Sequence, residues 1–187
     1  MPQFGRIGRI PAGSGPFSAG NYYQLGSGND VLDFTGSFYI AILFSIVGSP
    51  NAQALFNNSD TGSVGYRYQM NTGAIFDGFA GGTKDIGDNA NLISGAINLI
   101  LFGRVGNAIY GKTNGKAMVS QAPTGAYAAA TSSPTTIGWD FTGTQFTGNV
   151  YELLASGTSP GADAATVDAF FSYLTDKIRR AVSPLVW

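Results

Sequence analysis

From Asn21 onward, apolar and polar positions alternate with a period of two along most of the chain. The clearest stretch is 37–47. One face of it carries Phe38, Ile40, Ile42, Phe44 and Ile46, and the other carries Tyr39, Ala41, Leu43, Ser45 and Val47. Successive side chains on a strand point to opposite faces, so this alternation predicts a long strand. Because both faces are largely apolar, we expect the strand to lie in the middle of its sheet.

Eight further segments show the same short alternation. They are residues 52–56, 64–70, 74–79, 96–105, 108–111, 117–120, 135–139 and 148–155. Turn-forming Gly, Asn and Asp residues lie between them, at 57–62, 71–73, 81–91 and 113–115. Many short strands with frequent turns predict an all-β fold built as a two-sheet antiparallel sandwich.

Helical spacing occurs only near the end of the chain. One apolar stripe at intervals of three and four residues consists of Val167, Phe170, Phe171, Leu174 and Ile178. This spacing predicts one C-terminal helix at about 163–181 that packs on the sandwich. Two start signals are present, Ser159-Pro160 and Asp163, and basic residues lie in the last turn, where they suit the helix dipole.

The first twenty residues have a different composition, rich in Gly and Pro and without periodicity. Gly and Pro at this density oppose both helix and central strand, so we expect an extended arm at 1–20 followed by one domain at 21–187. Ordering such an arm costs about 1 to 2 kcal/mol per residue, which favours docking on a partner over packing on its own domain. The side chains expected to dock are Phe4, Arg6, Ile7, Arg9, Ile10 and Phe17.

The chain lacks most of the side chains that perform chemistry. It has no His, no Cys and a single Glu, Glu152. General acid-base and nucleophilic catalysis usually need a His or a perturbed carboxylate, and thiolate or imidazole metal sites are excluded outright. The close acidic pairs are Asp30 with Asp33 and Asp85 with Asp88, which turn or capping roles explain better. The composition therefore favours a protein that is not an enzyme.

Charge is sparse, with a formal net charge of −1 and only 11% charged residues. Acidic residues outnumber basic ones in the body, and the basic residues at the two ends are not clustered with aromatic residues, so we expect no nucleic-acid partner. No apolar run reaches 18 residues and no signal peptide is recognisable, which predicts no membrane insertion and synthesis in the cytoplasm. A neutral polar surface suits a turn-rich β protein or one covered by partner subunits.

The order of these features resembles the laminin-G-like, or concanavalin A-like, lectin/glucanase family. Four passages carry the resemblance: the opening at 22–40, a central hairpin at 98–117 that turns at Asn114-Gly115, the strand pair at 137–154 and the ending at 159–174. The resemblance implies a jelly-roll sandwich in which a concave face or a loop rim can bind glycans. The glucanase branch carries paired Glu residues flanking an Asp, and nothing of that form occurs around Glu152.

The resemblance also implies candidate binding residues. Parts of the family bind calcium through Asp, Asn and carbonyl oxygens on a loop, and the matching residues here are Asp85, Asp88, Asn89 and Asn91. Glycans stack on exposed aromatic rings and bond to polar side chains, and the candidates near turns are Tyr127, Trp139, Asp140 and Phe141. For Trp139, packing in the core is the alternative.

Two functions follow as hypotheses. The first is a structural component of a large assembly, namely a phage virion protein (head decoration, fibre or tail-associated) that displays a lectin-like domain. Its arm would dock on other virion proteins or on copies of itself after synthesis in the host cytoplasm. The alternative is a free-standing, extracellular lectin module that binds cell-surface polysaccharide. A glycoside hydrolase is a remote third hypothesis, because this chemistry needs two carboxyl groups about 5 to 10 Å apart and the sequence supplies no such pair.

Overall fold

A computed structural model describes residues 22–25, 32–48, 53–60, 64–130, 134–139 and 145–182. The predicted arm at 1–20, with all its expected docking side chains, lies outside these ranges. In the described ranges the strands form two antiparallel sheets. The six-stranded sheet runs in the order β1 (Tyr23–Leu25), β10 (Thr135–Ile137), β3 (Ala54–Asp60), β4 (Val64–Gln69), β5 (Gly73–Phe76) and β6 (Lys84–Asp85). The five-stranded sheet runs in the order β11 (Gly148–Ser156), β2 (Phe38–Ile46), β7 (Ile97–Val105), β8 (Ala108–Thr113) and β9 (Val119–Gln121).

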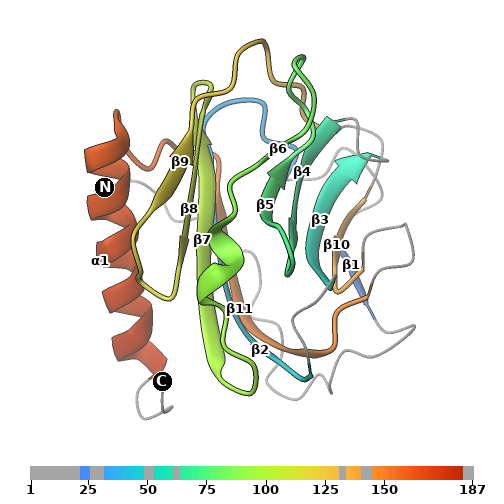
Figure 1. The fold of residues 1–187 in the computed structure, drawn as a ribbon, viewed down its shortest axis with the longest axis vertical. Helices are drawn as coiled ribbons and strands as arrows, with labels where there is room; N and C mark the ends of the chain where they lie inside the picture. Colours follow the sequence, from blue (N-terminus) through green and yellow to red (C-terminus); the bar gives the residue numbers. More distant parts are fainter. Residues whose placement is uncertain are drawn as a thin grey trace.

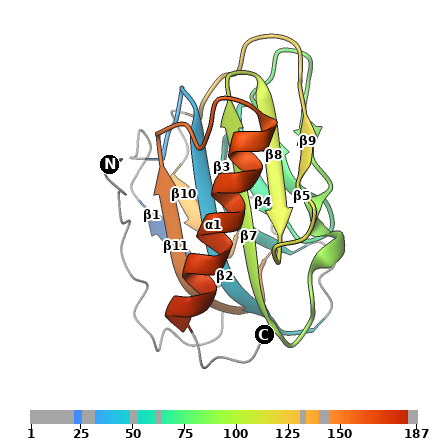
Figure 2. The same ribbon diagram turned by 90° about the vertical axis from the view of Figure 1, so that its left-hand side faces the viewer.

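The molecule is built in three layers (Figure 1). The α-helix α1 (Ala164–Val182) lies along the outer face of the five-stranded sheet, and the six-stranded sheet covers the other face of that sheet (Figure 2). A short 3-10 helix, η1 (Asp88–Asn91), lies between β6 and β7 in the chain. The predicted all-β sandwich with one C-terminal helix is confirmed. No helix in the described ranges is long and apolar enough to cross a membrane.

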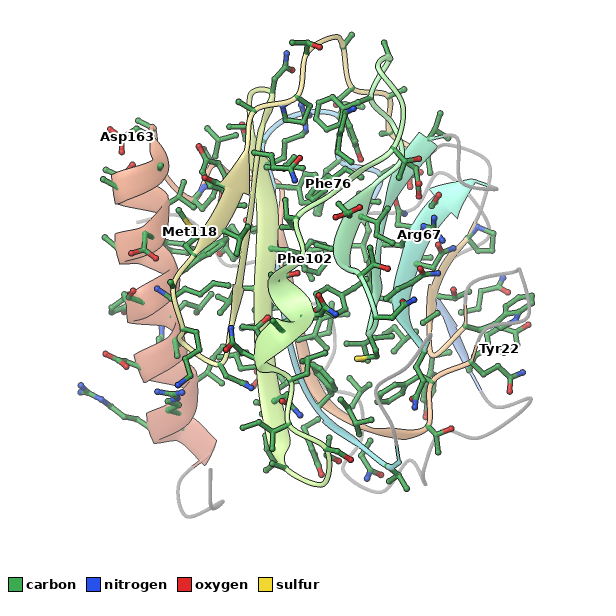
Figure 3. All side chains as sticks on the ribbon, in the orientation of Figure 1. Tyr22, Arg67, Phe76, Phe102, Met118 and Asp163 are labelled. Carbon is green, nitrogen blue, oxygen red and sulfur yellow. The ribbon has the colours of Figure 1, made fainter. Side chains whose placement is uncertain are left out.

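The main core fills the space between the sheets. Figure 3 shows Phe76, from the six-stranded sheet, and Phe102, from the five-stranded sheet, in this space, and their rings meet edge to face at 6.4 Å. Tyr66 lies 6.2 Å from Phe102 and donates a hydrogen bond to the Leu32 carbonyl, which satisfies its buried hydroxyl. Aromatic rings from both sheets therefore hold the two layers together.

Strand β2 lies between β11 and β7, as its two apolar faces predict. The face that points to the other sheet consists of Phe38, Ile40, Ile42, Phe44 and Ile46, all buried. The opposite face places Tyr39, Ala41 and Leu43 in a second core under α1. Burial on both sides explains why this segment is apolar throughout.

The predicted helical stripe is also confirmed. Val167, Phe171, Leu174 and Ile178 are buried against the five-stranded sheet, and Phe170 packs beside them. Asp163 is the start signal that the structure uses, since its carboxylate accepts a hydrogen bond from the Thr166 amide at 2.9 Å. This hydrogen bond holds the pKa of Asp163 below its ordinary value. Lys112 on β8 bonds Asp168 at 2.6 Å and Ser172 at 2.9 Å, which fixes the helix on the sheet.

Several boundaries differ from the pattern-based expectation, including the ends of β5, β8 and β9. Residues 57–60 were predicted as a turn but continue β3, because the Asn58 amide finds partners inside the protein, Asp33 at 3.0 Å and Thr135 at 2.8 Å. A polar residue whose hydrogen bonds are satisfied can occupy a buried strand position. The pair Lys84–Asp85 forms β6 inside a predicted turn, and β10 ends at Ile137 rather than at residue 139.

The helix layer should contribute much of the stability. We expect Phe171→Ala to lower the free energy of unfolding by about 3 to 5 kcal/mol, because it removes a fully buried ring from the core under α1. Tyr173→Ala is the matched control on the same helix, since Tyr173 is 56% exposed and should change stability by no more than about 0.5 kcal/mol. Urea denaturation followed by circular dichroism measures both, and equal effects would contradict the assigned helix face.

Candidate functional site

The helix covers one outer face of the sandwich and leaves the other to the six-stranded sheet (Figures 1 and 2). The strand register aligns one outward row across that sheet, each residue pairing with the next: Gln24, Thr136, Asn57, Arg67, Ile75 and Asp85. Most of this row is polar, whereas the inward row beside it is apolar. Thr136, Asn57 and Ile75 in this row are nonetheless buried, whereas Gln24 and Asp85 at its two ends are exposed and Arg67 is partly exposed. A ligand can therefore reach this sheet at its edges rather than across its middle.

A buried carboxylate organises the centre of this face. Asp77 accepts hydrogen bonds from Arg67 Nε at 2.8 Å, from Ser59 Oγ at 2.8 Å and from Thr83 Oγ1 at 3.1 Å. Its side chain is fully buried, while the Arg67 side chain keeps 21% of its surface exposed. The two charges therefore compensate each other, and the hydrogen bonds of Asp77 connect it to β3 through Ser59 and to β4 through Arg67.

Exposed aromatic rings occupy the β1 edge of the same sheet. The rings of Tyr22 and Trp139 lie 4.7 Å apart with an interplanar angle of 33°. Tyr22 is 41% exposed and Tyr23 is 40% exposed, and Trp139 is half-buried. Figure 3 shows Tyr22 at the margin of the molecule farthest from α1. We call Tyr22, Tyr23, Gln24 and Trp139 the aromatic edge.

Backbone contacts hold the aromatic edge in place. Strand β1 pairs with β10 through Tyr23 and Ile137, which brings Tyr22 beside the residues that follow β10. Gly138 has a positive φ of 92°, so the chain turns directly before Trp139. The Trp139 carbonyl accepts a hydrogen bond of 2.6 Å from Thr136, and Trp139 forms an isolated bridge with Gln145. The indole position is thus set by the sheet rather than by a long loop.

The predicted glycan-binding residues do not all meet here. Trp139 lies on the aromatic edge, while Asp140 and Phe141 lie outside the described residues. Tyr127 lies elsewhere, packed edge to face on Phe79 at 5.3 Å, with the Arg104 guanidinium 4.2 Å from its ring centre. Burial raises the pKa of the Tyr127 hydroxyl above its ordinary value. Tyr127 therefore serves packing at one end of the sandwich.

Sequence reasoning missed Tyr22 and Tyr23 as site residues. The only signal was a pair of aromatic residues in a short polar segment, which is equally typical of an edge strand. Their exposure comes from the position of β1 at the edge of the sheet, and their nearness to Trp139 comes from the pairing of β1 with β10. Neither can be read from local spacing.

The predicted calcium loop has a different arrangement. Asp88 is only 3% exposed, and its carboxylate accepts hydrogen bonds from the Ala74 amide at 2.9 Å and from Thr113 Oγ1 at 3.4 Å. The Asn89 amide donates to the Met70 carbonyl at 3.0 Å, whereas Asp85 and Asn91 are exposed. In the described ranges no three acidic side chains gather as a metal site. Asp88 thus serves the fold, and calcium binding by this loop stays a prediction.

Asp88 connects the two sheets. Its partner Ala74 belongs to β5 in the six-stranded sheet, and its partner Thr113 belongs to β8 in the five-stranded sheet. Gly73 and Gly111 leave room for the carboxylate, because an added Cβ would lie 2.2 Å and 2.7 Å from its two oxygens. Burial raises the pKa of Asp88 to about 6.

Comparisons with known proteins identify the fold but no family. No protein-family model and no curated protein matches the chain. Among solved structures, the binding domain of botulinum neurotoxin DC in complex with SialylT matches with a TM-score of 0.55 at 11% identity, over 94% of this chain and 45% of that one. Domain 4 of AbnA, a GH43 extracellular arabinanase from Geobacillus stearothermophilus, in complex with arabinotriose, matches with a TM-score of 0.52 at 12% identity, over 78% and 68%. A Trypanosoma rangeli sialidase in complex with the inhibitor DANA matches with a TM-score of 0.52 at 11% identity, over 75% of this chain and 23% of that one.

These similarities show a shared sandwich fold. The chain spans less than half the length of the neurotoxin binding-domain structures that it matches. At such low identity the fold alone does not assign a function.

The raised pKa of Asp88 predicts a pH-dependent stability. A carboxyl group whose pKa is higher in the folded state stabilises the fold when protonated, and that contribution is lost as pH rises through the folded pKa. With a shift from 3.8 to about 6, the free energy of unfolding should fall by about 2 kcal/mol between pH 4 and pH 7. Denaturant unfolding across this range measures the fall.

Two variants assign that fall to Asp88. Asp88→Asn keeps the shape and the hydrogen-bonding capacity without the charge, so its stability should change little over this pH range through this site. The exposed neighbour gives the control Asp85→Asn, which should keep the wild-type pH dependence. An unchanged pH profile in Asp88→Asn would show that another group is responsible.

Proposed function

We propose that this chain is a non-enzymatic, lectin-like carbohydrate-binding module whose ligand docks on the aromatic edge. The observation that carries the proposal is the contact of the exposed Tyr22 ring with the half-buried Trp139 ring at the margin of the sheet that α1 leaves uncovered. Sugar rings present an apolar C–H face and a rim of hydroxyls. Aromatic rings that are partly exposed and held at a fixed angle suit the apolar face, and nearby polar side chains suit the hydroxyls.

The polar part of such a site is present beside the rings. Gln24 is exposed on β1, in register with Thr136 on β10. Farther along the sheet, on β4 three strand spacings from β1, Arg67 presents a partly exposed guanidinium that Asp77 holds in place. A rigid platform lowers the entropy lost on binding, which matters for ligands as flexible as oligosaccharides.

Three acidic residues of the described ranges, Asp88, Asp77 and Glu152, do not meet at one site. Asp88 is buried and bonded to Ala74 and Thr113, so a substrate cannot reach it. Asp77 is buried and bonded to Arg67. Glu152 lies on β11 in the other sheet. A glycoside hydrolase needs two carboxyl groups facing one scissile bond, and these acids serve separate positions instead.

The comparisons support the same class of function. AbnA domain 4 shares the fold and was solved with arabinotriose, and the neurotoxin binding domain shares it and was solved with SialylT. These ligands belong to those proteins. They support the proposal because these proteins share the fold and were solved in complex with such ligands.

Removing the aromatic rings should abolish glycan binding. We expect Tyr22→Ala and Trp139→Ala each to weaken binding at least tenfold, because each removes part of the stacking surface. A polysaccharide panel of arabinan, mannan, galactan and β-glucan, followed by calorimetric titration of the strongest hit, measures the effect.

The matched control is Tyr173→Ala, which removes an exposed Tyr from α1 on the far side of the molecule. It should bind like the wild type. Equal binding by Trp139→Ala and the wild type, with both proteins folded by circular dichroism, would contradict the assignment of the site.

A second candidate function adds an assembly role. We propose that the module is carried by a larger particle, such as a phage virion, and docks through residues 1–20. The support comes from the sequence, which has a Gly- and Pro-rich segment with spaced apolar residues and only 11% charged residues overall. The corresponding location is the virion, with a free extracellular lectin as the alternative.

Deletion of residues 1–20 tests this role. The truncated chain should keep the stability of the sandwich and its glycan binding but lose incorporation into the particle or self-association, measured by light scattering and by particle pull-down. Full incorporation of the truncated chain would contradict docking through the arm.

A further inference from the structure

The short helix η1 lies between the two sheets at one side of the sandwich (Figure 1). It contacts β5 of the six-stranded sheet and β8 of the five-stranded sheet. Its buried side chain is Asp88, whereas Asn89 is half-buried and Ala90 and Asn91 are exposed. The inward contact of η1 is therefore made by a carboxyl group rather than by an apolar side chain.

The hydrogen-bond partners of Asp88 are neutral groups. Its carboxylate accepts from the Ala74 amide at 2.9 Å and from the Thr113 hydroxyl at 3.4 Å. A carboxylate buried among neutral partners loses its hydration, and this cost disappears when the group binds a proton. The closed position of η1 is therefore more favourable with a protonated Asp88 than with an ionised one.

The titratable groups on the neighbouring elements leave Asp88 as the group that titrates here. Tyr68 on β4 faces it, but burial and the charge of Asp88 raise the pKa of the Tyr68 hydroxyl well above its ordinary value, so it stays neutral. β5 contains no titratable residue. On β8, Lys112 bonds to α1 and Tyr110 packs in the core under α1. Asp85 on β6 is exposed to solvent.

η1 lies between two fixed points of the chain. Before it, the Ile86 amide bonds to a carbonyl of β5 at 3.1 Å and the Ile86 side chain is part of the main core. After it, the Asn98 side chain accepts from the Ile93 amide at 2.8 Å and donates to the Ile93 carbonyl at 2.9 Å. Gly87 has a positive φ of 56° and open space around it, so the chain can turn there at little steric cost. Residues 87–92 can therefore move while both ends stay anchored.

Three further contacts hold this segment closed. The Asn89 side chain donates to the Met70 carbonyl at 3.0 Å, the Asn114 side chain donates to the Asn91 carbonyl at 2.7 Å, and Leu92 packs on the main core. None of these groups titrates between pH 4 and pH 7. They set how often the segment opens, and Asp88 makes that frequency depend on pH.

We propose that residues 87–92 form a pH-sensitive latch, which closes this side of the sandwich while Asp88 is protonated and opens more often as Asp88 ionises. This inference does not depend on the proposed function. In the open latch the carboxyl group is hydrated and returns to its ordinary pKa of 3.8, against about 6 when it is buried. The open form therefore gains as pH rises, and the ratio of open to closed molecules should increase roughly 50-fold between pH 4 and pH 7.

Hydrogen exchange of single amides in the full-length chain, followed by NMR, tests the latch. The Ala74 amide is the reporter, because its acceptor is the Asp88 carboxylate. We expect its protection, corrected for the intrinsic exchange rate, to fall roughly 50-fold between pH 4 and pH 7. Low concentrations of urea should leave its exchange unchanged, because a local opening exposes little surface.

The Asp77 amide is the control in the same protein, since it follows β5 directly and donates to the Gly65 carbonyl at 3.0 Å. It should be better protected than the Ala74 amide and should lose protection as urea is added, as expected for global unfolding. If the two amides agree in protection and in urea dependence, or if Ala74 protection does not change with pH, the latch is refuted.

Two variants assign the opening to Asp88. Asp88→Asn keeps an acceptor oxygen for the Ala74 amide but does not titrate, so the protection of Ala74 should become independent of pH. The matched control Asp85→Asn changes an exposed acid on the neighbouring strand and should keep the wild-type fall. A fall that persists in Asp88→Asn, or one that is lost in Asp85→Asn, would overturn the role of Asp88.

Discussion

The structure depends on the burial of β2 on both of its faces. One face packs into the aromatic core between the sheets, and the other packs under α1. Because a strand cannot bury two apolar faces without two covering layers, the helix is required on the five-stranded sheet. The six-stranded sheet has a largely polar outer row. In the described part of the chain, no helix lies above the outer face of this sheet.

Buried polar groups give the sandwich its fixed geometry. Asp88 joins β5 to β8 across the two sheets, and Arg104 holds the carbonyls of the loop before β2 at the end of the sandwich. Burying the charge of Asp88 lowers the stability of the fold at neutral pH. The hydrogen bonds of Asp88 and Arg104 also specify one alignment of the layers. A scaffold fixed in this way can present Tyr22 and Trp139 at a constant angle, which is what a stacking site for flexible ligands requires.

The side-chain composition of this chain is consistent with the proposed binding function. The chain has no His and no Cys, and two of its described acids, Asp77 and Asp88, are buried and hydrogen-bonded inside the protein. Aromatic rings and neutral polar groups make up the aromatic edge. In the proposed function these groups would hold a sugar through apolar contact and directional hydrogen bonds.

The sequence by itself determined the two-sided apolar strand at 38–46, the helical stripe from Val167 to Ile178 and the absence of His and Cys. These features depend on local periodicity and composition, which any segment carries with it. Only the tertiary structure decided that Asn58 continues a strand, that Asp88 turns inward and that Tyr22 meets Trp139. Those outcomes depend on the register and burial of residues far apart in the chain, and a local sequence pattern specifies neither.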